Sequence, residues 1–197
     1  TQEMIDKDFE FWDWYMNKLI KHPQFMRDVI ARKTFSKLRS SLAGMYNAKH
    51  RDRESELAYR QSLALYELSP EANFKLADFY IKRQRFTEAG EVIEKLLEKD
   101  VENDKIGQFL QSISTLKRLN TRRLALEPKL MQNNQLNIST AFQLVGVYAS
   151  MAMGKECDDL ARQVMAMPRL PDNILYQLGE GMNRLKRRGV AKQIWEA

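Results

Sequence analysis

A column of leucines recurs along the chain with a period of about 34 residues, a spacing typical of helical repeats. The column consists of Leu42, Leu76, Leu110, Leu144 and Leu178. The residue after each leucine is small at positions 43, 77, 145 and 179, and Gln111 is the exception. Small residues let helices approach closely, and large residues fill the space between them. The pattern therefore predicts an array of helical units in which each unit contacts its neighbours.

The third unit departs from this pattern. Gln111, Arg123 and Glu127 stand in columns that hold small or apolar residues in most other units. We expect two helices in this unit, as in the others, but helices that are longer, bent or differently angled.

The first 34 residues follow a different pattern. Phe9, Trp12 and Met16 fall on one helical stripe. His22-Pro23 should end this helix, because proline disfavours the helical conformation of the residue before it. We expect an aromatic-rich helical cap over residues 1–34 and a repeat domain over residues 35–197. The predicted units lie near residues 36–68, 69–102, 103–136, 137–170 and 171–197.

The composition bounds where such a chain can reside. No stretch approaches the roughly 18 uncharged apolar residues of a membrane span, and no signal peptide is evident. Thr1 is not an initiator methionine, so we expect a processed product or an excised fragment. The single Cys157 excludes an internal disulfide and falls in a small-residue column, which predicts a packed thiol. A soluble domain, cytoplasmic or periplasmic, fits these features, and the compartment stays open.

The second unit resembles a tetratricopeptide repeat. It carries Leu76-Ala77-x-x-Tyr80 in its first helix and Phe86, Ala89 and Ile93 in its second, at the family's spacing. The resemblance extends from about residue 36 to the C-terminus and is weakest in the third unit. It implies an all-α, right-handed superhelix of about five helix-turn-helix units, whose first helices line a concave groove that holds a peptide, a helix or another protein. Such families are seldom enzymes.

The register of the resemblance implies which residues line the groove. The candidates are Phe74, Asp78, Ile81, Gln108, Phe142, Tyr176 and Glu180. Chaperone-binding members clamp a terminal carboxylate with lysine and asparagine, and Phe74 and Asp78 do not fit that chemistry. The aromatic candidates point instead to apolar anchoring of a partner. The alternative is that these rings pack against neighbouring units.

Basic residues cluster in the predicted turns between the two helices of most units. We call the following set the basic edge: Arg51, Arg53, Arg83, Arg85, Arg118, Arg187 and Arg188. Turns of this kind emerge on one edge of a solenoid, so the charges could bind an anionic membrane, an acidic partner or nucleic acid. The turns lack aromatic residues for base stacking, which disfavours nucleic acid. A plain solubilising edge is the remaining reading.

The aromatic lead-in has two readings. It can cap the exposed apolar end of the array, or Phe11, Trp14 and Tyr15 can lie at a membrane interface. The order of lead-in and repeats also loosely resembles the soluble tails of large bacterial multi-spanning membrane proteins of a glycosyltransferase-like kind. That resemblance implies peripheral membrane contact or a membrane-anchored parent chain.

Residues that could carry catalysis are scarce. His22 and His50 lack the neighbours of a catalytic triad or a metal site, and no glycine-rich phosphate-binding loop occurs. We therefore expect no enzyme, no cofactor and no metal. The sequence predicts a protein-interaction or scaffolding module that binds a peptide or protein in its groove, with surface docking through the basic edge as the alternative.

Overall fold

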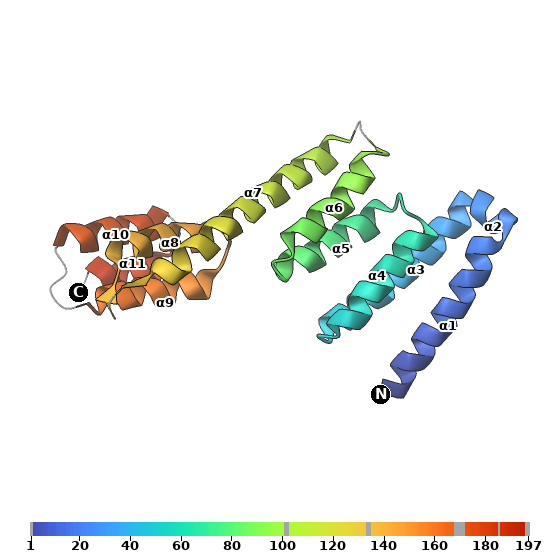
Figure 1. Ribbon diagram of the computed structural model, residues 1–197, viewed down its shortest axis with the longest axis horizontal. Coiled ribbons are helices and arrows are strands. Elements are labelled where there is room, and N and C mark those ends of the chain that lie inside the picture. The colour runs from blue at the N-terminus through green and yellow to red at the C-terminus, as the bar shows by residue number, and fades with distance from the viewer. Residues whose placement is uncertain (1, 101–102, 133–134, 168–171, 185, 196–197) are drawn as a thin grey trace. The chain divides into compact units, whose positions relative to one another are not determined.

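The computed structural model describes residues 2–100, 103–132, 135–167, 172–184 and 186–195. The chain divides into two compact units, Thr1–Ser114 and Thr115–Ala197. The first unit contains α1 (Gln2–Lys21), α2 (Pro23–Arg27), α3 (Val29–Ala48), α4 (Asp52–Leu65), α5 (Pro70–Lys82), α6 (Phe86–Leu97) and the start of α7 (Asp104–Leu126) (Figure 1). After α7 come η1 (Glu127–Lys129), β1 (Met131–Gln132), β2 (Gln135–Leu136), α8 (Ile138–Ser150), α9 (Gly154–Met165), α10 (Asp172–Arg184) and α11 (Arg188–Trp195).

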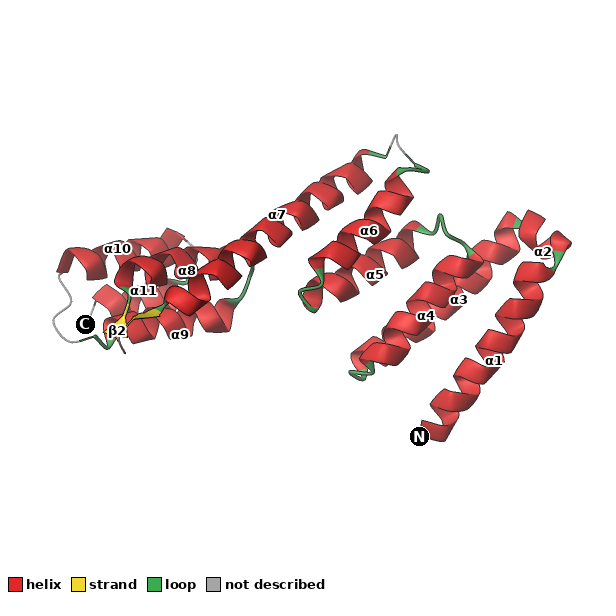
Figure 2. Ribbon diagram, in the orientation of Figure 1, coloured by secondary structure: helices red, strands yellow, loops and turns green. Residues whose placement is uncertain are grey.

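The helices pack in consecutive pairs, which confirms the predicted all-α repeat architecture. Short loops join the partners α3 and α4, α5 and α6, and α8 and α9 (Figure 2). A two-residue β ladder, Met131 opposite Leu136, is the one sheet within the described ranges. None of the described helices is long and apolar enough to span a bilayer.

The same turn joins the two helices in the pairs α3 and α4, α5 and α6, α8 and α9, and α10 and α11. One residue at an equivalent repeat position has a positive φ: His50 at 56°, Gln84 at 59°, Ala152 at 57° and Lys186 at 59°. The amide of the following residue then donates to a carbonyl of the preceding helix. These bonds run from Arg51 to Tyr46, Arg85 to Tyr80, Met153 to Tyr148 and Arg187 to Met182, at 2.8–2.9 Å. A left-handed residue at a helix end lets the chain reverse and satisfies otherwise unpaired carbonyls.

The prediction of two helices in the third unit is wrong. Residues 104–126 form the single helix α7, and Arg118, which holds the turn position of the other units, lies within it. A second helix folded back here would bury Arg123 and Glu127 without an apolar face to offset their desolvation. In the structure, Arg123 Nη1 of α7 donates to Glu127 Oε1 of η1 at 3.1 Å instead. The predicted basic turn at Arg118 therefore does not exist.

The leucine column supplies much of the core. Leu76 is buried in the first unit, and Leu144 and Leu178 are buried in the second, whereas Leu42 and Leu110 are half-buried. The thiol of Cys157 is buried and donates to Val145 O at 3.6 Å, which confirms the packed thiol. Ser55, at the equivalent position, donates to Ala43 O at 3.0 Å. In each of the two compact units, one small polar side chain thus forms a hydrogen bond between the two helices of a pair.

The aromatic lead-in folds as α1 and α2. His22 is extended and Pro23 opens α2, as expected from the proline. Trp12, Met16 and Phe25 form a buried cluster with Leu65 of α4. Asp28 caps α3 by accepting from the amide of Ala31 at 2.9 Å, so α3 begins before residue 34. The predicted unit boundaries at residues 102 and 170 fall outside the described residues.

Candidate functional site

The basic edge is to a large extent engaged in ion pairs between helix pairs. Arg83 contacts Asp52 of α4 through Nε at 2.8 Å and through Nη2, and its guanidinium lies 3.7 Å from the centre of the Phe79 ring. Arg85 Nη1 donates to Glu56 Oε2 at 2.6 Å and its Nε donates to Glu88 at 2.8 Å. These contacts hold the pKa of Asp52 below its usual value and raise the pKa of Arg83 and Arg85.

The second unit contains the same kind of contact. Arg187 Nε donates to Asp158 Oδ1 at 2.8 Å, and its Nη2 donates to the carbonyl of Gly154 at 3.0 Å. Arg51 makes a longer ion pair. Its Nη1 donates to Gln2 Oε1 at 2.7 Å and lies 3.5 Å from Glu54 Oε1. Arg53, Arg118 and Arg188 are exposed. Much of the charge predicted to face a partner is therefore balanced within the fold.

Glu56 is the centre of the polar contact between the pair α3 and α4 and the pair α5 and α6, which we call the joint. It accepts hydrogen bonds from Tyr80 Oη at 2.8 Å, from Arg60 Nη2 at 2.9 Å and from Arg85. Burial alone would raise the pKa of Glu56, but the hydrogen bonds from Arg85, Tyr80 and Arg60 outweigh it, so the pKa lies below its ordinary value. The joint is an arginine-rich network around one carboxylate, with no group set up for proton transfer.

The predicted groove residues divide between the two units. In the first unit Phe74 is half-buried, with its ring 5.0 Å from that of Phe109. Ile81 packs against the core, and Asp78 is exposed and pairs with Lys82 at 2.7 Å. Gln108 is exposed on α7. The structure thus places Phe74 and Ile81 mainly in packing roles and leaves Asp78 and Gln108 on the surface.

In the second unit the three predicted groove residues have different surroundings. Phe142 packs against the core from a half-buried position, and Glu180 is half-buried. Tyr176 is 62% exposed. It occupies the repeat position of Phe74, so it is the aromatic of this column that remains open to a partner.

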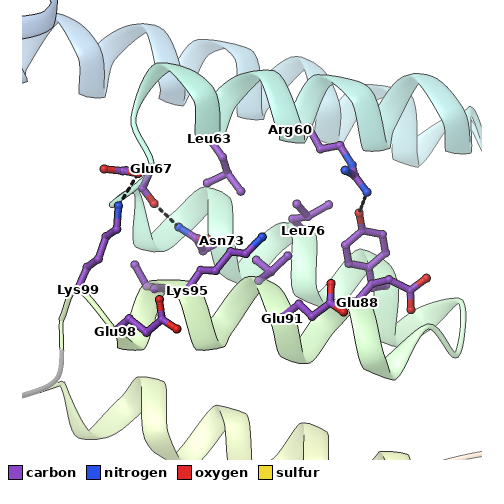
Figure 3. A pocket seen from close by; sticks show the side chains of 13 residues that line it. Arg60, Leu63, Glu67, Asn73, Leu76, Glu88, Glu91, Lys95, Glu98 and Lys99 are labelled. Atoms are coloured by element: carbon purple, nitrogen blue, oxygen red, sulfur yellow. Dashed lines mark hydrogen bonds and ion pairs between the residues drawn. The ribbon is translucent and has the colours of Figure 1, made fainter.

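The first unit also has a cleft elsewhere, between α4 and α6 over a floor made by α5 (Figure 3). Its volume is about 340 Å³. The buried side chains of Asn73, Leu76 and Leu96 form the floor, and Leu63 and Val92 are half-buried in the walls. Charged residues of both signs surround the opening: Arg60, Glu67, Glu88, Glu91, Lys95, Glu98 and Lys99.

Polar contacts fix the walls of this α4–α6 cleft. Lys99 Nζ pairs with Glu67 at 2.6 Å, and Asn73 Nδ2 donates to the carbonyl of Glu67 at 2.8 Å (Figure 3). Asn73 Nδ2 also donates to the carbonyl of Ser69 at 2.9 Å. At the other end Arg60 Nη2 donates to Tyr80 Oη at 3.0 Å. The cleft is therefore preformed, with an apolar base and a charged rim.

The sequence pattern did not predict the α4–α6 cleft, because the repeat register assigns binding positions only to the first helices and the turns. A signal was present in α6, where Glu88, Glu91, Lys95 and Glu98 alternate with Val92 and Leu96 at helical spacing. A charged face with apolar residues at its edge is also what an ordinary solvated helix shows. Only the position of α4 beside α6 turns this face into one wall of a cleft.

The described residues offer little for metal or acid–base chemistry. In these ranges there is no group of three or more His, Cys, Asp or Glu side chains that could hold a metal ion. His22 and His50 are both exposed. The expectation that the chain is not an enzyme stays a prediction.

Neither the models of known protein families nor the curated proteins gave a match to this chain. Among solved structures, it is similar to the crystal structure of YrrB, described as a TPR protein with an unusual peptide-binding site. The two share 18% identity over 92% of this chain and 89% of the other, with a TM-score of 0.34. At that TM-score the likeness carries no information on where this chain binds a ligand.

Proposed function

We propose that this chain is a protein-interaction module that binds a short peptide segment of a partner in the α4–α6 cleft. The observation that carries the proposal is the preformed cleft with its apolar base and charged rim. Clefts of this composition are where ligands usually bind, since apolar walls supply affinity and a few polar groups set orientation.

The size of the cleft limits the ligand. At about 340 Å³ it lies near the lower end of ligand sites, which favours a few side chains of a peptide over a folded domain. One or two apolar side chains would fill the space over Leu76 beside Leu63 and Val92. Acidic groups of the ligand would face Arg60 and Lys95, and basic groups would face Glu91 and Glu98.

The predicted groove positions on the first helices offer a second candidate surface for the same function within each unit. Asp78 and Gln108 in the first unit and Tyr176 in the second are exposed and available to a partner. The groove lacks the preformed cavity of the α4–α6 cleft, so we place it second.

Docking through the basic edge is the alternative function. The exposed side chains of Arg53 and Arg188 motivate it, and the ion pairs of Arg83, Arg85 and Arg187 weaken it. Binding of this kind would fall steeply with rising salt.

The membrane-anchored parent chain suggested by the aromatic lead-in also remains a proposal. The reading frame upstream of Thr1 tests it: several apolar spans there would support it, and a start codon immediately upstream would oppose it.

The test begins with selection of short peptides from a random library against the full chain, followed by measurement of Kd for the enriched peptides. Val92→Arg and Lys95→Glu alter the cleft, whereas Asp78→Lys and Gln108→Glu alter the predicted groove at exposed positions. We expect the cleft variants to weaken binding about tenfold or more and the groove variants to leave Kd unchanged. Circular dichroism melting curves confirm that all four variants fold.

The reverse result would move the site to the groove. Two results together would support the basic edge instead: all peptides are released at moderate salt, and the chain binds anionic vesicles or nucleic acid.

A further inference from the structure

Two residues of α3 are exposed at positions that are buried in the first helices α5, α7 and α8 and half-buried in α10, at Ile174 and Gly181. Leu38 is 51% exposed and Met45 is 58% exposed. The equivalent positions, one or more repeats along the chain, are Ala72 and Phe79 in α5, Ile106 and Ile113 in α7, and Thr140 and Val147 in α8. All six of these residues are buried. Leu38 and Met45 therefore break a pattern of burial that α5, α7 and α8 keep.

Contacts in the first unit show what covers these positions elsewhere. The ring of Phe79 lies 6.3 Å from the ring of Tyr59 in α4, the second helix of the preceding pair. Ile113 reaches α6, where its Cγ2 would lie 4.0 Å from a Cβ built on Gly90. At these positions a first helix stacks against a helix of the preceding pair.

The helix α1 covers a different stripe of α3. It contacts Phe35, Arg39 and Tyr46: the ring of Tyr15 lies 5.5 Å from that of Phe35, Asp8 pairs with Arg39 at 2.6 Å, and Phe9 stacks on Tyr46 at 5.6 Å. At about 100° per residue, Leu38 and Met45 lie roughly a quarter turn away from that stripe. They remain uncovered beside α1.

The helix α1 contributes an exposed aromatic residue on the side where Tyr15 contacts Phe35. Phe11 is 52% exposed and stacks on Tyr15, with ring centres 5.4 Å apart. Tyr15 in turn meets Phe35, three residues before Leu38. We call the surface formed by Phe11, Leu38 and Met45 the N-terminal trough.

The charges around the N-terminal trough are basic. The sequence of α3 contains no aspartate or glutamate, and Lys37 is exposed next to Leu38. On α1, helical spacing places Lys7 and Lys18 on the side of Phe11, Asp6 and Asp13 on the opposite flank, and Glu10 between these two flanks. Lys7 pairs with Glu3, but both side chains are largely exposed, so this pair contributes little.

We propose that the N-terminal trough binds an amphipathic α-helix of a partner protein, with an apolar stripe and acidic residues along its flanks. A helix is the expected occupant because a helix covers the equivalent residues Phe79 and Ile113 inside the fold. Leu38 and Met45 are seven residues apart, about two helical turns, which suits a ligand with apolar anchors at i, i+3, i+4 and i+7. Acidic flanks complement Lys7, Lys18 and Lys37.

The experiment uses the full chain and a displayed library of amphipathic helices. The apolar stripe is randomised, and the flanking positions are all glutamate, all lysine or all glutamine. We expect the glutamate class to be enriched, and Leu38→Ser with Met45→Ser to weaken the selected helices about tenfold or more. Both positions are exposed, so the melting temperature should not change.

Matched controls separate this site from others. Leu57→Ser alters an exposed leucine of α4 and should leave Kd unchanged. Val92→Arg alters the α4–α6 cleft and should also have no effect, so this test can succeed or fail independently of the peptide proposal.

Several results would overturn the proposal. These are enrichment of the lysine class, enrichment no greater than on the Leu38→Ser, Met45→Ser variant, or equal loss with Leu57→Ser. Binding of the unaltered chain to vesicles of anionic phospholipid, lost in the double variant and with no helix enriched, would assign the trough to a membrane surface instead.

Discussion

Arg187 donates from Nε to Asp158 at 2.8 Å across 29 residues of sequence, and Arg85 is related to Glu56 by the same separation. Each arginine directly precedes or opens the second helix of its pair, and each acid lies on the second helix of the pair before it. The repeat therefore includes a recurring ion pair between neighbouring helix pairs. This relationship explains why arginines recur in the turns without requiring a nucleic acid or a membrane.

The joint around Glu56 should contribute measurably to stability. We expect Glu56→Gln to lower the free energy of unfolding by about 2 kcal/mol, because Arg85, Arg60 and Tyr80 lose a charged acceptor that is only 20% exposed. Urea unfolding at pH 7 measures the change. Glu88→Gln is the control, since Glu88 is more exposed and Arg85 is the arginine that pairs with it. An equal loss in both variants would contradict a central role for Glu56.

The same carboxylate predicts a pH dependence. The pKa of Glu56 is below its ordinary value of 4.5, so its stabilising contribution is complete above pH 4.5 and is lost as the pH falls through the folded-state pKa. The difference in unfolding free energy between the unaltered chain and Glu56→Gln should therefore be constant near neutrality and should shrink below pH 4.5. A difference that stays constant down to acid unfolding would show that Glu56 does not supply it.

The sequence was sufficient to predict the repeat and its helix pairs. The leucine column, the small residues beside it and the packed position of Cys157 all depend on local spacing, which the fold preserves. The third unit was mispredicted because the leucine period continues through Leu110, whereas the charges at Arg123 and Glu127 favour one continuous helix. The repeat spacing alone does not reveal the free-energy cost of desolvating these two charged side chains.

The candidate sites were harder to predict because they depend on contacts between distant residues. The arginines of the turns could be recognised from sequence, but their partners Asp52, Glu56 and Asp158 lie in other helix pairs. The α4–α6 cleft and the N-terminal trough likewise arise only where two helices meet. The handedness of the array and the partner-binding roles of Phe74 and Tyr176 stay predictions.

Cys157 should be protected from thiol reagents in the folded chain. Its side chain is buried, and burial raises the pKa of the thiol, so both access and thiolate formation are disfavoured. We expect reaction with an aromatic disulfide reagent to be at least about a hundredfold slower in buffer than in denaturant. Equal rates in the two conditions would place the thiol on the surface.

The attachment of α1 depends on a buried ion pair. The side chain of Arg39 is fully buried, and Asp8 of α1 is the carboxylate that pairs with it at 2.6 Å. Asp8→Asn should cost about 3 kcal/mol, because it leaves the guanidinium charge uncompensated beneath α1. Glu3→Gln, which removes an exposed acid of the same helix, should cost less than about 0.5 kcal/mol. Similar urea midpoints for both variants would mean that the attachment of α1 does not depend on the pair of Asp8 and Arg39.

Tyr46 should make stability depend on alkaline pH. Its hydroxyl donates to Asp8 at 2.7 Å, and burial together with this carboxylate raises its pKa from 10.0 to about 12. The folded chain therefore holds the phenolic proton more tightly, so the contribution is complete below pH 10 and is lost as the pH rises toward 12. Tyr46→Phe should cost about 1 kcal/mol at pH 8, and this deficit should shrink between pH 10 and pH 12. Tyr148, whose pKa is also raised to about 12 beside Glu127, offers an independent repeat of the test in the second unit. A deficit that does not change over this range in either variant would show that the hydroxyl-to-carboxylate bonds do not stabilise the two units.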